Sequence, residues 1–172
     1  LDDSVVACKC LRLAKLNEKR KSELKHETEL LRELGHPNVV KLVGAGVRGP
    51  DYVIVMEMLV RDLFDIVLSS AEGVAPDRAA QYFADMLRGV AHCHRHGVVH
   101  RDVKLENAMV DVRGRVKLID FGLAHKYLPV LGTGAAASGK KPVPGLERRS
   151  SNLDKEKDFQ VYKLKSIVGS RA

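Results

Sequence analysis

The alternation of apolar and polar side chains divides the first part of the chain into short strands and helices. Residues 18–34 carry apolar side chains at helical spacing, and this predicted helix ends before Gly35 and Pro37. A second long helix is expected from Pro76, a residue suited to a first helical turn, to Gly97. The other predicted elements are a short helix over residues 63–68 and strands at residues 5–13, 39–43, 52–58, 98–99 and 116–119.

The long helix after Pro76 carries an apolar stripe that we expect to face the core. Its acidic residues Asp77 and Asp85 are expected to be solvated charges. The stripe consists of Ala79, Phe83, Met86, Leu87 and Val90.

One acidic residue interrupts the apolar face of the first long helix. Glu27 lies three residues after Leu24 and four before Leu31, so it falls on their face. A carboxylate there is costly unless a cation pairs with it, and Lys9 in the strand just upstream is the natural partner. Glu29 lies about 200° around the helix and is expected to face solvent. On this pattern alone, the alternative that Glu27 merely borders the stripe stays open.

Composition places the chain among ordinary globular proteins, with 45% hydrophobic and 30% charged residues over 172 positions. No apolar run reaches the roughly 18 residues of a membrane span, and no signal peptide is visible. We therefore expect no membrane partner. Three cysteines do not make a disulfide framework, which favours a reducing, intracellular setting, cytoplasmic or nuclear.

The net charge of +7 is concentrated in one polar segment. Residues 126–165 hold nine Lys or Arg against four Asp or Glu, a net of +5, and no basic face interleaved with aromatic residues appears elsewhere. We therefore expect no nucleic-acid partner. Residues 129–147 are rich in Gly, Ala, Pro, Ser and Lys, a composition that cannot bury a core. An insert at residues 127–165 is accordingly expected to be disordered.

Two short polar segments carry the candidate chemistry, and each follows a predicted strand. The first, residues 100–107, reads His-Arg-Asp-Val-Lys-Leu-Glu-Asn and offers a base, a cation and a metal ligand. The second, Asp120-Phe121-Gly122, begins thirteen positions after Asn107 and adds a carboxylate. Carboxylate and amide oxygens suit hard divalent cations. Together the segments resemble the catalytic loop and the magnesium-binding loop of eukaryotic protein kinases.

Earlier segments extend this resemblance toward the start of the chain. Val6-Ala7-Cys8-Lys9 resembles the kinase strand motif V-A-I-K, with Cys8 at its apolar third position. Glu27 precedes His36-Pro37-Asn38 by nine residues, which is similar to the place of the regulatory-helix glutamate before the H-P-N turn of kinases. The resemblance covers residues 1–126 and resumes at 166–172.

The catalytic-loop segment also indicates a group within that family. Lys104, two residues after Asp102, resembles the lysine of serine/threonine kinases rather than tyrosine kinases. The run over residues 93–107 most resembles the calcium/calmodulin-dependent and energy-sensing kinases.

The resemblance implies an α+β, protein kinase-like two-lobe fold that is truncated. A Gly-rich loop and an A-P-E segment are missing from the sequence, so the chain resembles an incomplete catalytic domain that we expect to be inactive alone. The expected parts are a partial small lobe at residues 1–58, the upper large lobe at 59–126, a disordered activation-loop insert at 127–165 and the start of a substrate-docking loop at 166–172.

The same resemblance implies roles for single side chains in phosphoryl transfer from ATP with Mg²⁺. Asp102 would accept the proton of the substrate hydroxyl, and Lys104 would stabilise charge on the γ-phosphate. Asn107 and Asp120 would hold the metal. The residues implied in nucleotide binding are Lys9, Glu27, Ala7, the gatekeeper Met56, the hinge residues Glu57 and Leu59, Asp62 and Met109.

The activity implied for the parent protein is ATP-dependent phosphorylation of serine or threonine in protein substrates. The alternative is a catalytically inactive kinase-like fragment that acts as a binding or scaffold module. Inactive kinase-like proteins usually lack the lysine, the base or the metal aspartate. Because Lys9, Asp102 and Asp120 are all present, the sequence favours the enzyme.

Three further residues are candidates for regulation. Ser166 resembles an activation-loop phosphosite, the target of an upstream kinase, and Arg101 would bind its phosphate. Ser151 follows Arg148 and Arg149, a basic context that suits a basophilic kinase. We expect this kinase, or a basophilic relative, to phosphorylate Ser151, and the alternative is a solvated basic linker.

Overall fold

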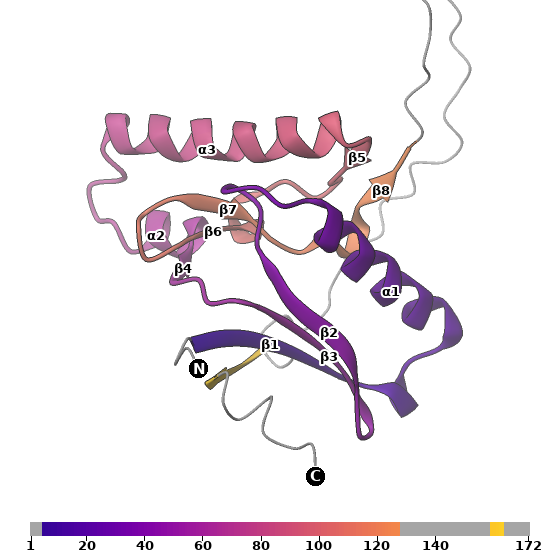
Figure 1. Ribbon diagram of the computed structural model, residues 1–172. Coiled ribbons are helices and arrows are strands. Elements are labelled where there is room, and N and C mark those ends of the chain that lie inside the picture. The colour runs from indigo at the N-terminus through magenta and orange to yellow at the C-terminus, as the bar shows by residue number, and fades with distance from the viewer. Residues whose placement is uncertain (1–4, 128–158, 164–172) are drawn as a thin grey trace, which may run out of the picture.

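The computed structural model describes residues 5–127 and 159–163, which form two packed parts (Figure 1). The first part is an antiparallel four-stranded sheet in the order β2-β3-β1-β9, with helix α1 (Glu18–Glu33) beside it. The side chain of Asn17 caps α1 by accepting a hydrogen bond from the N–H of Arg20 at 2.8 Å. The strands are β1 (Val5–Arg12), β2 (Leu42–Arg48), β3 (Asp51–Glu57) and β9 (Phe159–Lys163).

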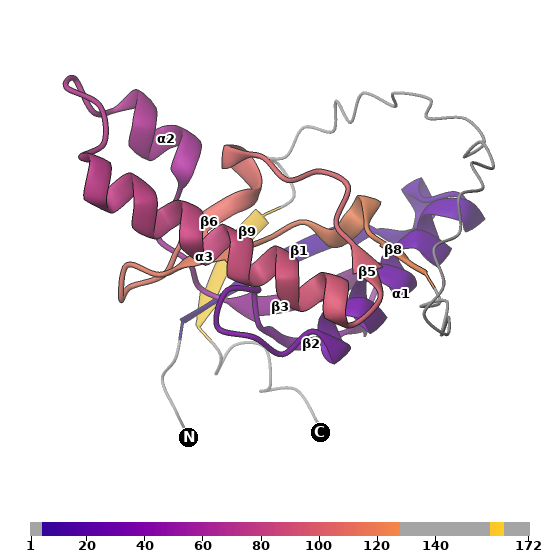
Figure 2. The same ribbon diagram turned by 90° about the horizontal axis from the view of Figure 1, so that it is seen from above.

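The second part is built on helix α3 and the antiparallel hairpin of β6 and β7, along which α3 lies (Figures 1 and 2). The combination of a sheet with separate helices confirms the expected α+β class. None of the described helices combines the length and the apolar character needed to span a membrane. The elements are β4 (Arg61–Asp62), α2 (Leu63–Leu68), α3 (Pro76–Arg95), β5 (Val98–Val99), β6 (Ala108–Val110), β7 (Val116–Leu118) and β8 (His125–Lys126), with 3-10 turns at Leu105–Asn107 and Phe121–Leu123. In the first part, a 3-10 turn at Leu13–Lys15 lies between β1 and α1.

One continuous apolar core joins the two parts. Leu24 and Leu31 of α1 and Ile54 of β3 belong to the same buried cluster as Leu118 of β7 and Phe121. Complete burial of one such side chain contributes about 1.5–3 kcal/mol. This cluster is therefore the main reason that the sheet and the hairpin keep a fixed arrangement.

The segment between α1 and β2 attaches the sheet to β7. Val40 donates its N–H to the carbonyl of Leu118 at 3.0 Å, and Leu118 donates to the carbonyl of Asn38 at 3.0 Å. The Nδ2 of Asn38 also donates to the carbonyl of Val116 at 2.8 Å. Because this part of the predicted strand at residues 39–43 pairs with β7, the strand of the main sheet begins later than predicted.

Helix α3 buries a face that overlaps the predicted stripe only at Met86 and Val90. Phe83 and Leu87 are 62% and 51% exposed, whereas Asp85 is 6% exposed. The Oδ2 of Asp85 accepts the N–H of Val116 at 3.0 Å, which satisfies a buried backbone donor at the start of β7. The prediction that Phe83 and Leu87 face the core and that Asp85 faces solvent is wrong, because the hairpin selects the helix face that fits against it.

Strand β9 contradicts part of the predicted disorder. Residues 159–163 pair antiparallel with residues 5–9 of β1. The disordered insert expected at 127–165 therefore does not extend over β9, whose pairing satisfies backbone groups at the edge of β1 with which no other described strand pairs. Ser151 and Ser166 lie outside the described residues.

Candidate active site

An ion pair joins strand β1 to helix α1 in the candidate site. Ala7, Lys9 and Leu11 share one face of β1, and Leu11 belongs to the main core. The Nζ of Lys9 lies 3.5 Å from Oε1 of Glu27, and both side chains are largely buried. The other oxygen, Oε2, has no hydrogen-bond partner among the described residues. The predicted pair of Lys9 with Glu27 is therefore present, and its carboxylate is only partly satisfied.

Glu27 also faces the Asp120-Phe121-Gly122 segment. A Cβ added at Gly122 would lie 3.6 Å from Oε2 of Glu27 and 3.2 Å from Oδ1 of Asp120. Asp120 has a left-handed backbone conformation, with φ of 59°, which is strained in a residue other than glycine. Such strain persists only where the surrounding structure imposes it, and it concentrates at functional sites.

The side chains of Asp102, Lys104 and Asn107 form one polar cluster. The Nδ2 of Asn107 donates to the backbone carbonyl of Asp102 at 2.8 Å and to its Oδ2 at 2.7 Å. The Nζ of Lys104 lies 3.1 Å from the same Oδ2. Two donors therefore converge on one oxygen of Asp102 and fix the orientation of its carboxylate.

Contacts between the two loops hold this cluster in place. Ile119 donates its N–H to the carbonyl of Asn107 at 2.9 Å. The Nδ1 of His100 accepts the N–H of Asp102 at 3.3 Å, and its Nε2 lies 2.9 Å from the carbonyl of Ile119. A tautomer protonated at Nε2 satisfies both contacts. The ring of His100 packs edge-on against Phe121, with 4.7 Å between centroids, so both candidate metal-binding loops share one support.

Arg101 ties the catalytic loop to the segment that follows Gly122. Its backbone is left-handed, with φ of 66°, and its Nε donates to the carbonyl of Leu123 at 2.6 Å. The side chain is otherwise exposed, and a guanidinium has further N–H donors. The side chain of Arg101 therefore contacts the start of the segment that leads, along the chain, to the candidate phosphosites.

The candidate adenine-binding segment connects β3 to β4. Ala7 pairs with Met56 across β1 and β3, and Met109 pairs with Asp62 across β4 and β6. The side chain of Asp62 caps the N-terminus of α2. Leu59 is buried, and its backbone N–H and C=O make no hydrogen bond with other described residues. A planar ligand with one donor and one acceptor on its edge would satisfy both groups.

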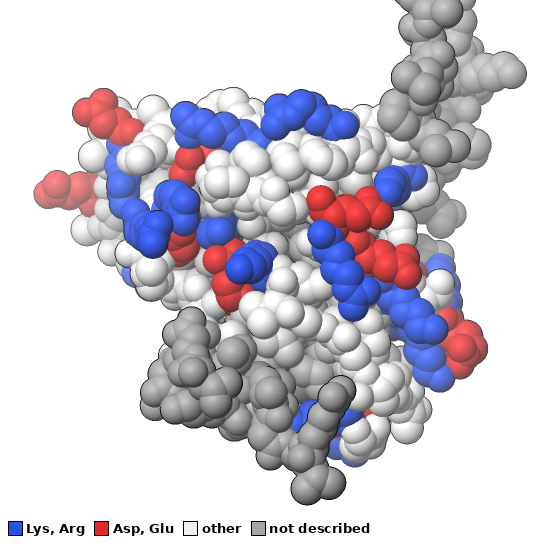
Figure 3. All heavy atoms as spheres, viewed as in Figure 1, with Lys and Arg blue, Asp and Glu red and all other residues white. Residues whose placement is uncertain are grey.

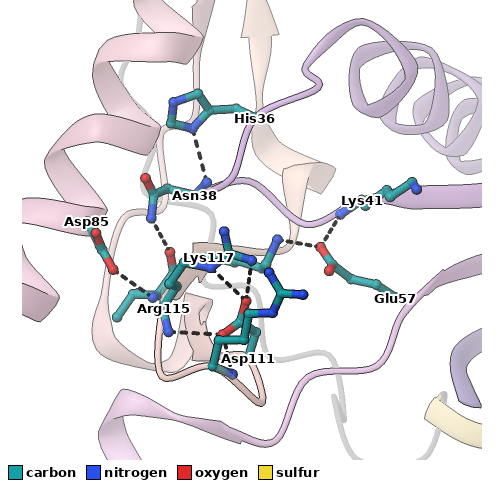
Figure 4. A network of polar contacts seen from close by, with 10 residues as sticks. His36, Asn38, Lys41, Glu57, Asp85, Asp111, Arg115 and Lys117 are labelled. Atoms are coloured by element: carbon teal, nitrogen blue, oxygen red, sulfur yellow. Dashed lines mark hydrogen bonds and ion pairs between the residues drawn. The ribbon is translucent and has the colours of Figure 1, made fainter.

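Sequence reasoning missed one charged residue next to this segment. On the face shown in Figure 3, acidic and basic side chains are interspersed at the surface. Lys117 of β7 is instead buried, with an exposed fraction of 5%. Its Nζ lies 2.9 Å from Oε1 of Glu57 (Figure 4). The available signal was the lysine between Val116 and Leu118, because a charge within an apolar strand needs a partner.

Three histidines stack where α3 meets the segment before β2. The ring of His92 lies 4.5 Å from that of His36 and 4.2 Å from that of His96, measured between centroids. Burial lowers the pKa of His92 and of His36, and the positive charge of Arg95 adds to the effect. Within the part of the chain that the structure describes, no group of three or more His, Cys, Asp or Glu residues is placed to hold a metal ion. We therefore interpret the stack as ring packing rather than as a metal site.

These features together define a class of protein. A lysine paired with a helix glutamate, a supported aspartate and asparagine, and an Asp-Phe-Gly segment lie on an α+β scaffold in the order typical of protein kinases. The protein kinase domain family matches residues 1–131. The chain therefore belongs to the protein kinase family and has an α+β kinase fold.

Two curated relatives point to a group within the family. The chain is 34% identical over 125 residues, 72% of its length, to NUAK family SNF1-like kinase 2 of Pongo abelii, and equally to the protein of that name from Homo sapiens. The alignment covers 20% of each relative, so the chain spans about a fifth of the length of the curated relatives it matches. The similarity confirms the resemblance to the energy-sensing group of kinases.

Proposed function

We propose that the whole protein transfers the γ-phosphoryl group of ATP to serine or threonine hydroxyls of protein substrates. The observation that carries the proposal is the pair of contacts in which Asn107 donates to Asp102 and Ile119 donates to Asn107. These contacts join the candidate base, one candidate metal ligand and the strand that leads to Asp120. Phosphoryl transfer depends mainly on positioning and charge neutralisation, so a rigid unit of this kind suits it.

The donor atoms of this unit fit Mg²⁺. Asp120 offers carboxylate oxygens, and Asn107 offers an amide oxygen that is directed away from Asp102 because Nδ2 faces Asp102. Asn107 is fully buried, which keeps this oxygen in a fixed orientation. Asn107 and Asp120 would hold the ion, and the positive charge it supplies when bound would neutralise part of the charge of the phosphates.

The side chains around this unit would each perform one task. Asp102 would orient the acceptor hydroxyl and accept its proton, and Lys104 beside it would stabilise negative charge on the transferred group. Lys9 would bind the α- and β-phosphates. Glu27, at 3.5 Å, holds the Lys9 ammonium without occupying all three of its donors.

The segment after β3 would recognise the base of the nucleotide. The N–H and C=O of Leu59 would bind the edge of adenine, which carries both an acceptor and a donor. Ala7, Met56 and Met109 would contribute apolar surface for its faces. Asp62, which already caps α2, would contact the ribose or the substrate.

This proposal is tested by incubating the whole protein with radiolabelled ATP and a peptide library. Each peptide of the library offers serine, threonine or tyrosine as its sole acceptor. We expect label on the serine and threonine peptides that disappears when EDTA removes Mg²⁺. Label on tyrosine peptides alone would contradict the proposal. A protein that binds ATP but transfers no phosphate would support the alternative of a binding or scaffold module.

We also propose that an upstream kinase regulates the protein through Ser166. Arg101 is adjacent to Asp102 and contacts the carbonyl of Leu123, so a phosphate bound by Arg101 would act directly on the catalytic loop. Mass spectrometry of the active protein should find phosphate at Ser166. Its absence there, together with full activity of Ser166→Ala, would contradict this mechanism.

A basophilic substrate preference is a further proposal. Arg148 and Arg149 precede Ser151, and guanidinium groups pair well with carboxylates. We expect phosphate at Ser151 when the whole protein is incubated with ATP, and none in an Asp102→Ala control. If neither this protein nor basophilic kinases phosphorylate Ser151, the segment is a basic linker.

A further inference from the structure

One buried lysine has no task in the transfer described above. Lys117 is 5% exposed, and its Nζ lies 2.9 Å from Oε1 of Glu57. The Lys117 end of the pair is buried and the Glu57 side chain is 25% exposed. Removing the ammonium from water carries a desolvation penalty, and an apolar side chain of similar volume is often at least as stabilising. The pair at this position therefore calls for an explanation other than stability.

The acidic partner of Lys117 lies at the end of β3, directly before the candidate adenine-binding segment. The carboxylate oxygen that meets Lys117 also accepts the backbone N–H of Lys41 at 2.7 Å (Figure 4). The backbone N–H of Glu57 donates to the carbonyl of Lys41 at 3.0 Å. Both the side chain and the backbone of Glu57 are therefore fixed, which sets the position at which residues 58–60 begin.

The other end of the pair is equally well held. Lys117 pairs with Met109 across β6 and β7, and it lies three residues before Asp120. The neighbouring Val116 has its N–H bound by Asp85 and its carbonyl bound by Asn38. Lys117 therefore extends from a rigid strand that leads to the metal-binding loop.

We infer that Lys117 is a positioning residue, which sets the adenine-binding segment relative to the metal-binding loop through its ion pair with Glu57. The inference rests on the proposed function, which places the adenine of ATP near the Glu57 end of this pair and the phosphates near the loop that follows Lys117. Lys117 contacts neither of them. Loss of the pair would shift residues 58–60 while Lys9, Asn107 and Asp120 stay in place.

Calorimetric titration of the whole protein with adenosine, and separately with magnesium tripolyphosphate, distinguishes the two halves of the nucleotide. In Lys117→Met we expect the Kd for adenosine to rise about tenfold and the Kd for tripolyphosphate to stay within about twofold of wild type. A merely structural role would weaken both ligands together, so that result would overturn the inference.

Arg115→Met is the matched control. Arg115 lies two residues earlier in the same hairpin and forms an ion pair of the same 2.9 Å length with Asp111 instead of Glu57. We expect this variant to bind adenosine as tightly as wild type. A tenfold loss in Arg115→Met would show that any damaged ion pair in the hairpin has this effect, and it would overturn the specific role of Lys117.

A second variant covers the case in which Lys117→Met does not fold. Glu57→Gln keeps a side-chain acceptor for the N–H of Lys41 and removes the charge that pairs with Lys117. It should show the same selective loss of adenosine affinity, and unchanged affinity in Glu57→Gln would overturn the inference while the proposed function stands. A wild-type protein that binds neither adenosine nor Mg-ATP would overturn the proposed function, and this inference with it.

Discussion

The Lys9–Glu27 pair and the Lys117–Glu57 pair have the same chemistry but different surroundings. The first joins β1 to α1 at 3.5 Å, and one oxygen of Glu27 has no hydrogen-bond partner among the described residues. The second joins β7 to β3 at 2.9 Å, and Glu57 also binds the backbone of Lys41. A long pair with an unsatisfied oxygen can exchange contacts when a charged ligand arrives, whereas a short, satisfied pair holds two elements at a fixed separation.

We propose that this difference reflects two separate roles. The Lys9–Glu27 pair would bind the phosphates of ATP, and the Lys117–Glu57 pair would position the adenine-binding segment. Lys9 would leave part of its hydrogen-bonding capacity for phosphate, and Glu27 holds it in reach. Lys117 has no such task, because its charge is already matched by Glu57. The predictions that follow test whether these two pairs, and the elements that support them, act separately.

The largest effect is expected at Asp102, the proposed base of the transfer. Asp102→Ala removes the carboxylate that we propose orients the acceptor hydroxyl, so kcat should fall by about a thousandfold or more. Steady-state rates with a serine peptide measure it, and ATP affinity measured by titration should be nearly unchanged. Retention of most activity in this variant would place the base elsewhere.

A smaller loss is expected when the first pair is broken. Glu27→Gln removes the charge that holds Lys9, and we expect about a hundredfold lower kcat/KM. Glu29→Gln is the matched control, because Glu29 lies two residues away on the exposed side of α1. Equal losses in the two variants would contradict a specific role for Glu27.

Gly89→Ala tests the packing of α3 against Asn38 and β7, the strand that carries Lys117. A Cβ at Gly89 would lie 2.6 Å from the carbonyl oxygen of Asn38, the residue that also binds β7. We expect the free energy of unfolding to fall by about 1–3 kcal/mol, although alanine normally favours a helix. Gly46→Ala is the control, since no atom of the described residues other than its chain neighbours lies within 4 Å of its added Cβ. Denaturant unfolding of both variants measures the difference.

The smallest effect concerns pH and the histidine stack next to Asn38. Burial lowers the pKa of His92 and of His36 below the ordinary value near 6.5. The unfolded chain therefore binds more protons, and the stability present above about pH 6.5 is lost as pH falls toward the folded-state values. The melting temperature should decrease between pH 7.5 and 5.5.

Substitution of one stacked histidine should reduce that dependence. His92→Gln should flatten the change in melting temperature over this range, whereas the exposed His94→Gln should leave it as in wild type. A dependence of the same size in His92→Gln would assign the effect to other groups.

Local signals were enough for several elements and for the first ion pair. The bounds of α2 match the predicted residues 63–68, and α1 ends within one residue of its prediction. Glu27 was recognised because a charge on an apolar helix face needs a partner, and Lys9 lies in the adjoining strand. Where neighbouring elements in the chain form the contact, the residue pattern is sufficient.

Several contacts between distant segments were not predicted. Asp85 is buried because the N–H of Val116, far along the chain, needs an acceptor, and Phe83 is exposed because the hairpin packs on the other face of α3. Lys117 was missed because its partner Glu57 lies on another strand. Strand β9 was missed because its pairing depends on an open edge of β1 rather than on its own composition. Tertiary packing decides each of these cases.

The most direct test of the comparison measures kcat and the KM for ATP in Glu27→Gln and Glu57→Gln, two substitutions that remove the same charge. The account predicts that Glu27→Gln mainly lowers kcat, because phosphate is no longer held correctly for transfer. Glu57→Gln should instead raise the KM for ATP about tenfold with kcat nearly unchanged, because only the base is displaced. The same pattern of changes in both variants would contradict separate roles for the two pairs.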